Sequence, residues 1–213
     1  MDPDFWHWRW QENKIGFHES DTNPLLVKHF DALSLSDGAR VFIPLCGKTL
    51  DIHWLLAKGY RVVGAELVET AIQQLFAELG VEPDITEVGA FKQSSAQGID
   101  IFVGDFFNLS DAILGPVDAV YDRAALVALP EAMRKRYARH LITVTNKAPQ
   151  LLLSFEYDQS LVPGPPFSVG PDEVHEYYEG YYTITLAELV VLQGGLKGKY
   201  DCLEAVWLLS AVK

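Results

Sequence analysis

The chain lacks the features of a metal-binding, disulfide-bonded or membrane-spanning protein. It has 2 cysteines in 213 residues, Cys46 and Cys202, and their spacing suits neither a metal site nor a disulfide framework. No apolar run approaches the roughly 18 residues of a membrane helix. Residues 1–10 show no basic segment followed by an apolar one, so no signal peptide is predicted. We expect a cytoplasmic protein in a reducing compartment.

Positive charge is also scarce. The 17 Lys and Arg residues are outnumbered by 29 Asp and Glu residues, which gives a net charge of −12. Such a surface repels phosphate backbones and anionic lipids, so neither nucleic acid nor a membrane is an expected partner. With 49% apolar and 22% charged residues, a chain of this length can bury one sizeable core. We expect a single domain over residues 1–213, acting as a monomer on a small molecule.

Common catalytic motifs are missing. The 6 histidines form no H-E-x-x-H pattern and no cluster with cysteine, and no G-x-S-x-G elbow occurs. The segment Gly47-Lys48-Thr49 matches the end of a P-loop, but the position that requires an earlier glycine holds Phe42. No metal ligand and no catalytic acid, base or nucleophile is therefore predicted.

The chain does contain a strand-loop-helix-strand unit over residues 40–67. Its first strand ends in a loop with one glycine, Gly47, and its second strand ends on Glu66, 19 residues later. At this spacing a Rossmann-like unit offers a carboxylate to a ribose diol, although Glu66 could also merely end the strand. A dinucleotide needs G-x-G-x-x-G, of which only one glycine is present. The unit therefore favours a nucleoside ligand without a pyrophosphate, and S-adenosylmethionine is the commonest such cofactor on this fold.

Strands and helices continue to alternate after this unit. A helical pattern at 69–79 is followed by strands at 99–104 and 118–121, a helix from Pro130 and a strand at 150–155. Residues 81–98 predict a hairpin or a loop, and residues 163–167 a stiff, exposed loop. Two apolar segments, 182–192 and 202–212, are joined by a glycine-rich turn. The order predicts an α/β fold, a Rossmann-like three-layer sandwich whose mixed sheet ends in an antiparallel C-terminal hairpin.

Ligands of open α/β sheets bind outside the carboxyl ends of the strands. Those ends carry a glycine loop, two acids and an acid-arginine pair: Leu45-Cys46-Gly47, Glu66, Asp105-Phe106 and Asp122-Arg123. Together these groups suit ribose hydroxyls, an adenine amine and an amino-acid carboxylate. Singly, each has a simpler explanation. Asp105 can end a strand and Cys46 can be a small packed residue, while Arg123 can pair with Asp122 or a surface acid.

Aromatic residues gather near the N-terminus. Residues 5–10 hold 3 of the 5 tryptophans, and Trp6 and Trp10 fall on one helical face. One interpretation is a helix packed on the sheet. The other is a lid over residues 1–30 that covers the cofactor, because aromatic faces suit a sulfonium cation and closure excludes water.

The residues resemble the thiopurine S-methyltransferases, particularly their bacterial members. The matching stretches occur in the family's order and span nearly the whole chain: Trp6-x-x-x-Trp10, Lys14-Ile-Gly-Phe-His18, Pro44-Leu-Cys-Gly-Lys48, Val63-Gly-Ala-Glu-Leu67, Gly104-Asp-Phe-Phe107, Tyr121-Asp-Arg-Ala-Ala-Leu-Val-Ala-Leu129, Glu156-Tyr-Asp158 and Pro163-Gly-Pro-Pro-Phe167.

This resemblance implies transfer of the methyl group of S-adenosylmethionine to the sulfur of aromatic and heterocyclic thiols, thiopurines included. It implies that four residues contact the cofactor, namely Trp10, Leu45, Glu66 and Arg123. It further implies that Asp105 and Phe106 flank the adenine and that Phe17 lies between cofactor and acceptor. One departure concerns the acceptor, because the basic residues of the animal proteins are replaced here by the short stretch 194–199.

Such a reaction needs little acid-base chemistry, because an aromatic thiol is partly ionised near neutral pH and its thiolate is the nucleophile. We therefore expect that no single residue is an essential base. Other functions stay open: a methyltransferase for halides, small thiols or selenium and tellurium compounds, or a sensor that binds the cofactor without turnover. An NAD-dependent oxidoreductase is disfavoured by the missing glycines.

Overall fold

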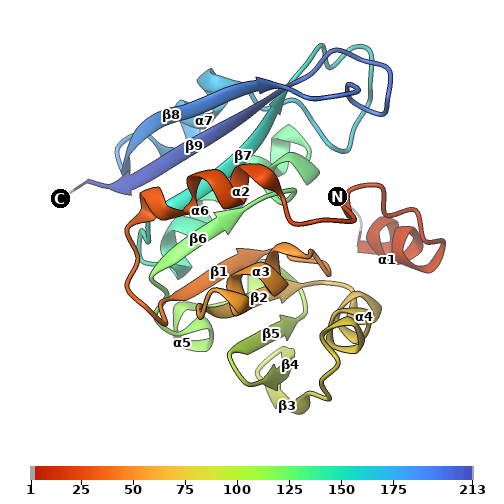
Figure 1. The fold of residues 1–213 in the computed structure, drawn as a ribbon, viewed down its shortest axis with the longest axis vertical. Coiled ribbons are helices and arrows are strands. Elements are labelled where there is room, and N and C mark those ends of the chain that lie inside the picture. The colour runs from red at the N-terminus through yellow and green to blue at the C-terminus, as the bar shows by residue number, and fades with distance from the viewer. Residues whose placement is uncertain (1–2, 213) are drawn as a thin grey trace.

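The structure, a computed structural model, describes residues 3–212 and is built on a nine-stranded sheet (Figure 1). The strand order is β3-β4-β5-β2-β1-β6-β7-β9-β8. The central strands β5, β2, β1, β6 and β7 are parallel, and antiparallel strands flank them at both edges. The strand bounds are β1 Arg40–Pro44, β2 Arg61–Glu66, β3 Asp84–Val88, β4 Phe91–Ala96, β5 Ile99–Val103, β6 Ala119–Asp122, β7 Gln150–Glu156, β8 Tyr182–Val191 and β9 Leu203–Ala211.

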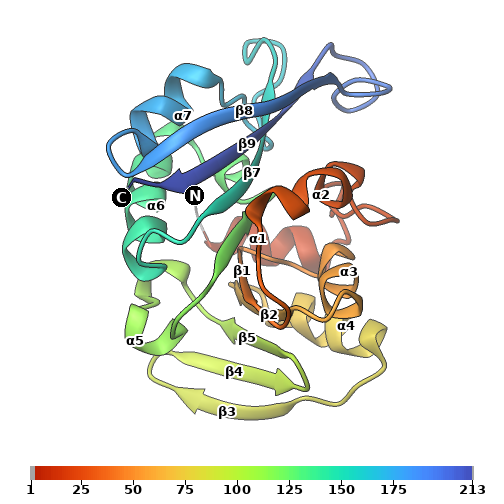
Figure 2. The same ribbon diagram turned by 60° about the vertical axis from the view of Figure 1, so that its left-hand side comes forward.

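Helices cover both faces of this sheet, which makes the predicted three-layer sandwich. Figure 2 shows α2, α3 and α4 on one face and α5, α6 and α7 on the other. The helix bounds are α1 Pro3–Gln11, α2 Pro24–His29, α3 Asp51–Ala57, α4 Glu69–Leu79, α5 Asp111–Leu114, α6 Glu131–Val144 and α7 Pro171–Tyr178. Three short 3-10 helices complete the described residues: η1 Phe30–Leu33, η2 Phe106–Asn108 and η3 Leu126–Ala128.

The alternation of side chains along each central strand divides the core into two apolar layers. In β1, Phe42 packs with Tyr137 of α6, whereas Val41 and Ile43 pack on the other face with Leu26 of α2. Helices cover both faces of the sheet (Figure 2), so the side chains of β1 are buried on either face and its sequence after Arg40 is apolar. Each such side chain contributes about 1.5–3 kcal/mol on burial. The core thereby fixes the strand ends that carry the polar residues.

The C-terminal hairpin confirms the predicted antiparallel ending. Strand β9 pairs with β8 on one side and with β7 on the other, so the end of the chain lies inside the sheet. Glu204, near the start of β9, lies opposite Phe155 near the end of β7. The first residues of β9 therefore lie at the carboxyl edge of the parallel strands.

Residues 81–98 form a hairpin, the first of the two predicted alternatives. β3 pairs with β4, and β4 pairs antiparallel with β5, so the hairpin extends the sheet at its edge. The prediction that residues 163–167 are exposed is wrong apart from Pro163. The loop folds back, because the Phe167 amide donates to the Val127 carbonyl (2.7 Å) and the Tyr157 hydroxyl donates to the Pro166 carbonyl (2.6 Å).

Helix α2 has no counterpart in the sequence-based prediction. Its six residues are too few to show a helical period. The side chain of Asn23 caps it by accepting hydrogen bonds from the amides of Leu25 (2.9 Å) and Leu26 (3.2 Å), whose side chains are buried. The helix follows the N-terminal segment and ties it to the sheet.

Candidate active site

The loop after β1 turns sharply at the carboxyl edge of the sheet. Leu45 and Gly47 both adopt left-handed backbone conformations, with φ of 48° and 51°. The Cys46 amide donates to the Ala65 carbonyl of β2 (3.0 Å), which holds the loop against the second strand. A Cβ atom on Gly47 would lie 3.2 Å from the ring of Trp10. Glycine is therefore favoured here by both the backbone conformation and the close approach of the tryptophan.

The Glu66 carboxylate lies directly beneath this loop. Its Oε2 accepts a hydrogen bond from the Gly47 amide (2.8 Å), and its Oε1 accepts one from the Val68 amide (2.8 Å). The side chain is 7% exposed, and burial raises the pKa of Glu66 although the backbone donors oppose the shift. Each carboxylate oxygen can accept a further hydrogen bond. Glu66 can therefore hold the glycine loop and still accept a ribose hydroxyl.

At the end of β5, Asp105 and Phe106 differ in exposure. Asp105 is exposed, and its carboxylate accepts from the Phe107 amide (3.0 Å), which caps η2. The Phe106 ring is buried, with Phe42 stacked at 6.3 Å and Tyr137 at 5.2 Å between ring centroids. This packing leaves the main chain of Phe106 as the part that can flank an adenine.

Arg123, after β6, lies between two carboxylates. Its guanidinium contacts Glu19 of the N-terminal segment (2.5 Å) and Asp51 of α3 (3.6 Å). Burial alone would lower the pKa of Arg123, but Tyr121, Asp51 and Glu19 outweigh it and raise that pKa. The surface acid expected from the sequence is thus Glu19, which is 49% exposed against 12% for Arg123. Asp51 is a buried second partner that the sequence did not indicate.

Asp51 joins three segments at this position. Its carboxylate accepts hydrogen bonds from the Asn23 amide (2.8 Å) and the Tyr121 hydroxyl (3.0 Å), besides its contact with Arg123. An acid that opens a short helix is ordinary in a sequence, and nothing local indicates partners in β6 and ahead of α2. Through Asp51, the Arg123 side chain is fixed relative to the N-terminal segment.

Asp122 points away from Arg123, to the opposite face of the sheet. It accepts from the Tyr137 hydroxyl (2.7 Å) and the Leu126 amide (3.1 Å), and burial raises its pKa to about 6. Ala124 in the same turn has a left-handed φ of 60°. The suggested pair between Asp122 and Arg123 does not form, and Asp122 instead stabilises the turn that presents Arg123.

The N-terminal aromatic residues form a small cluster at the same edge. Trp10 is 5% exposed and packs with Val68 and Ala71 at the start of α4. Phe17 lies against both Trp6 and Trp10, each at 5.8 Å between ring centroids and in an edge-on orientation. The cluster covers the glycine loop and the residues after Glu66 rather than the middle of the sheet.

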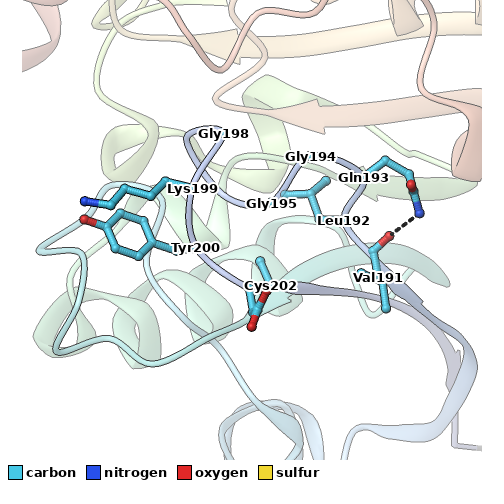
Figure 3. Close-up of a pocket in the computed structure, with 10 residues that line it drawn as sticks. Val191, Leu192, Gln193, Gly194, Gly195, Gly198, Lys199, Tyr200 and Cys202 are labelled. Atoms are coloured by element: carbon cyan, nitrogen blue, oxygen red, sulfur yellow. Dashed lines mark hydrogen bonds between the residues drawn. The ribbon is translucent and has the colours of Figure 1, made fainter.

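A separate hollow of about 290 Å³ lies at the tip of the C-terminal hairpin (Figure 3). Residues 191–195 and 198–202 of the hairpin itself line it, and the Gln193 amide group donates to the Val191 carbonyl (3.4 Å). Its walls carry no residue of the predicted site. In the part of the chain from 3 to 212, no three His, Cys, Asp or Glu side chains gather to bind a metal ion. The helices of that same part are all too short or too polar to cross a membrane.

The sheet and the helices on its two faces have a Rossmann-like fold, which solved S-adenosylmethionine-dependent methyltransferases share. The structure superposes on an S-adenosylmethionine-dependent methyltransferase from Anabaena variabilis with a TM-score of 0.70, at 12% identity over 99% of this chain and 95% of the other. A 1,6-didemethyltoxoflavin-N1-methyltransferase from Burkholderia thailandensis, solved with S-adenosylhomocysteine, gives 0.66 at 14% identity, over 98% and 87%.

Residues 1–203 match the thiopurine S-methyltransferase (TPMT) family, and the chain belongs to it. A thiopurine S-methyltransferase of Xanthobacter autotrophicus is 58% identical over 211 residues, which are 99% of each chain. Family, fold class and methyl donor therefore agree with the sequence-based predictions.

Proposed function

We propose that this protein transfers the methyl group of S-adenosylmethionine to the sulfur of aromatic and heterocyclic thiols, thiopurines included. The observation that carries the proposal is the Glu66 carboxylate held under a single-glycine loop and covered by Trp10. That arrangement offers an acceptor to ribose hydroxyls and an aromatic wall to a sulfonium, with no glycine-rich cradle for a pyrophosphate. The 58% identical relative carries the thiopurine S-methyltransferase name.

The roles proposed for the site residues follow from their positions. Cofactor contacts are assigned to Trp10, Leu45, Glu66, Asp105, Phe106 and Arg123. Phe17 is assigned to the boundary between cofactor and acceptor, because its ring touches Trp6 and Trp10 in the cover. Residues 1–30 act as a lid on a single methyltransferase domain, and the carboxyl edge of the sheet is the floor beneath it.

When bound, S-adenosylmethionine supplies an electrophilic methyl group on a positively charged sulfur. The residues of this chain then need to bind the donor and the acceptor, orient them toward each other and exclude water. Orientation of two reactants can lower a barrier by up to about 7–11 kcal/mol. Because a thiolate and a sulfonium lose their charges as they react, the apolar cover of Trp10 and Phe17 favours the reaction over the separated ions.

The test is a labelled-methyl assay with the purified protein and a panel of thiols, selenols and halides. We expect labelled thioethers from thiophenols and 6-mercaptopurine. Turnover of halides or hydrosulfide with none of aromatic thiols would replace this function by that of the small-anion methyltransferases. Tight binding of S-adenosylhomocysteine without turnover of any acceptor would instead indicate a sensor, and calorimetry with NADH tests the oxidoreductase alternative.

We further propose a monomer that works in the cytoplasm without nucleic acid. The supports are the net charge of −12 and two unpaired cysteines, both buried. Light scattering of the purified protein tests whether it is a monomer, and fractionation of cells tests whether it is in the cytoplasm.

A further inference from the structure

Glu204 is a buried carboxyl group that the proposed roles leave unused. It is 8% exposed, and its strand neighbours are Phe155 of β7 and Val190 of β8. Among residues 3–212, no side chain or amide forms a hydrogen bond or an ion pair with its carboxylate. A buried acid without a partner is costly in its charged form and is rarely kept for packing alone.

Glu204 lies at the carboxyl edge of the sheet, on the β7 and β9 side of β6 and away from Glu66 on β2. The start of β9 runs beside the end of β7, and Arg123 follows the neighbouring strand β6. Arg123 and Glu19, which pair with each other, are the charged groups that act on Glu204. Cys202, two residues upstream, is the other titratable group beside it.

The ionisation of Glu204 suits exchange of a proton near neutral pH. Burial raises the pKa of Glu204 to about 7, since the attraction of Arg123 does not compensate the loss of water. The Cys202 thiol has a pKa raised to about 11, by burial first and by Glu204 second, so it stays protonated. A group whose pKa is close to the working pH is the most effective general base.

We propose that Glu204 accepts the proton that a weakly acidic acceptor loses when its sulfur is methylated. The acceptor sulfur forms its bond to the methyl carbon while the carbon–sulfur bond of the donor breaks and leaves its electron pair on the donor sulfur. The S–H or ring N–H proton of the acceptor passes to a Glu204 oxygen and later to water. This inference rests on the proposed function and concerns its range of acceptors.

The role is conditional, which agrees with the expectation that no residue is an essential base. A thiol that is already ionised in water has no proton to give, and Glu204 is idle toward it. A thiol that is protonated near neutral pH needs an acceptor for its proton. Glu204 therefore extends the range of usable acceptors from acidic aromatic thiols to weaker ones and to thione tautomers that carry the proton on nitrogen.

The experiment compares Glu204→Gln with the unchanged protein on two acceptors, 4-nitrothiophenol and benzyl thiol. We expect kcat/KM to stay within about threefold for the acidic thiol and to fall about 10²-fold for the weak one. The matched control is Asp201→Asn, which changes an exposed carboxylate three residues away and should alter neither value. Equal losses on both thiols, or a loss on neither, would overturn the role.

A readout without turnover accompanies the kinetics. Carbon-13 NMR of the glutamate side-chain carboxyl groups, with the Glu204 signal assigned by its absence in Glu204→Gln, should give a midpoint near pH 7 for Glu204. A midpoint at the ordinary value for glutamate would contradict the inference. Failure of the unchanged protein to methylate 4-nitrothiophenol would count against the proposed function itself. Methylation of both thiols with an unaltered ratio in the variant would count only against Glu204.

Discussion

The two halves of the carboxyl edge are stabilised in different ways. In the cofactor half, formed by residues 45–47, Glu66 and Asp105, each carboxylate accepts hydrogen bonds from nearby backbone amides. In the acceptor half, formed by Asp51, Arg123, Glu19 and Glu204, charged side chains from distant segments meet one another or, for Glu204, meet no partner.

The difference bears on how each half responds to ligands and pH. Backbone amides are fixed by the strands and helices they belong to, so the cofactor half is preorganised before anything binds. The acceptor half depends on the balance of a few charges and on the position of the N-terminal segment that carries Glu19. We expect substitutions in the first half, and of Arg123 at the border of the two, to change affinity for the donor. Substitutions of Glu19 and Glu204 should change pH dependence and acceptor range.

The largest effect should come from Glu66→Ala. The change removes the acceptor proposed for the ribose and also frees the Gly47 amide, so S-adenosylhomocysteine should bind about 10- to 100-fold more weakly, at ~1.5–3 kcal/mol. Titration calorimetry measures this. The control is Glu69→Ala, which changes a half-exposed acid on α4 that pairs with Lys92 of β4 and should leave binding normal. Unchanged affinity in Glu66→Ala would contradict the proposal that Glu66 binds the ribose.

The next effect concerns stability in the acceptor half. The folded-state pKa of Glu204, about 7, is above its ordinary value of 4.5, so the folded protein holds this proton more firmly than the unfolded chain. The free energy of unfolding should therefore fall as the pH rises through this interval. Glu204→Gln should be more stable than the unchanged protein by about 1–2 kcal/mol near pH 8, with no such gain near pH 5. Urea unfolding at the two pH values measures it, and an equal difference at both would contradict the assigned ionisation.

A smaller effect is expected when the lid is weakened. Trp10→Ala removes the ring that lies against Gly47, and affinity for S-adenosylhomocysteine should fall about tenfold. Trypsin should then cleave after Lys14 faster than in the unchanged protein, and the ligand should protect less. Gln11→Ala, on the same helix and exposed, is the control. If both variants behave alike, the aromatic cluster serves only to anchor the helix.

The smallest effect should follow from Glu19→Gln. Its ion pair with Arg123 is half exposed on the Glu19 side, and such pairs contribute about 0–1 kcal/mol. Donor affinity should change less than threefold. The apparent pKa in the pH profile for weak thiols should fall slightly, because Glu204 loses a neighbouring negative charge. A rise in that pKa would show that Glu19 does not act on Glu204.

The cofactor half was largely predictable from the sequence, because its signals are local. Gly47 and Glu66 lie on one strand-loop-helix-strand unit, and acids at strand ends are visible in the order of elements. The sequence showed that aromatic residues gather near the N-terminus. It left open whether they pack on the sheet or cover the cofactor.

The acceptor half was not predictable in the same way. Asp51 begins α3, which follows β1, and Arg123 follows β6, so the two meet because β1 and β6 are neighbours in the sheet. Glu19 contacts Arg123 from the N-terminal segment, which the Asn23 amide joins to Asp51. In the sequence, Glu204 is only an acid near the start of an apolar strand. Its burial follows from the insertion of β9 between β7 and β8. Partners that depend on strand order leave no local pattern.

The most direct test is a structure of the protein with S-adenosylhomocysteine bound. We expect the ribose over Glu66, the loop of residues 45–47 along the adenosyl group and the ring of Trp10 across the sulfur. Density for the ligand at any other place, such as the hairpin tip of residues 191–202, would contradict it.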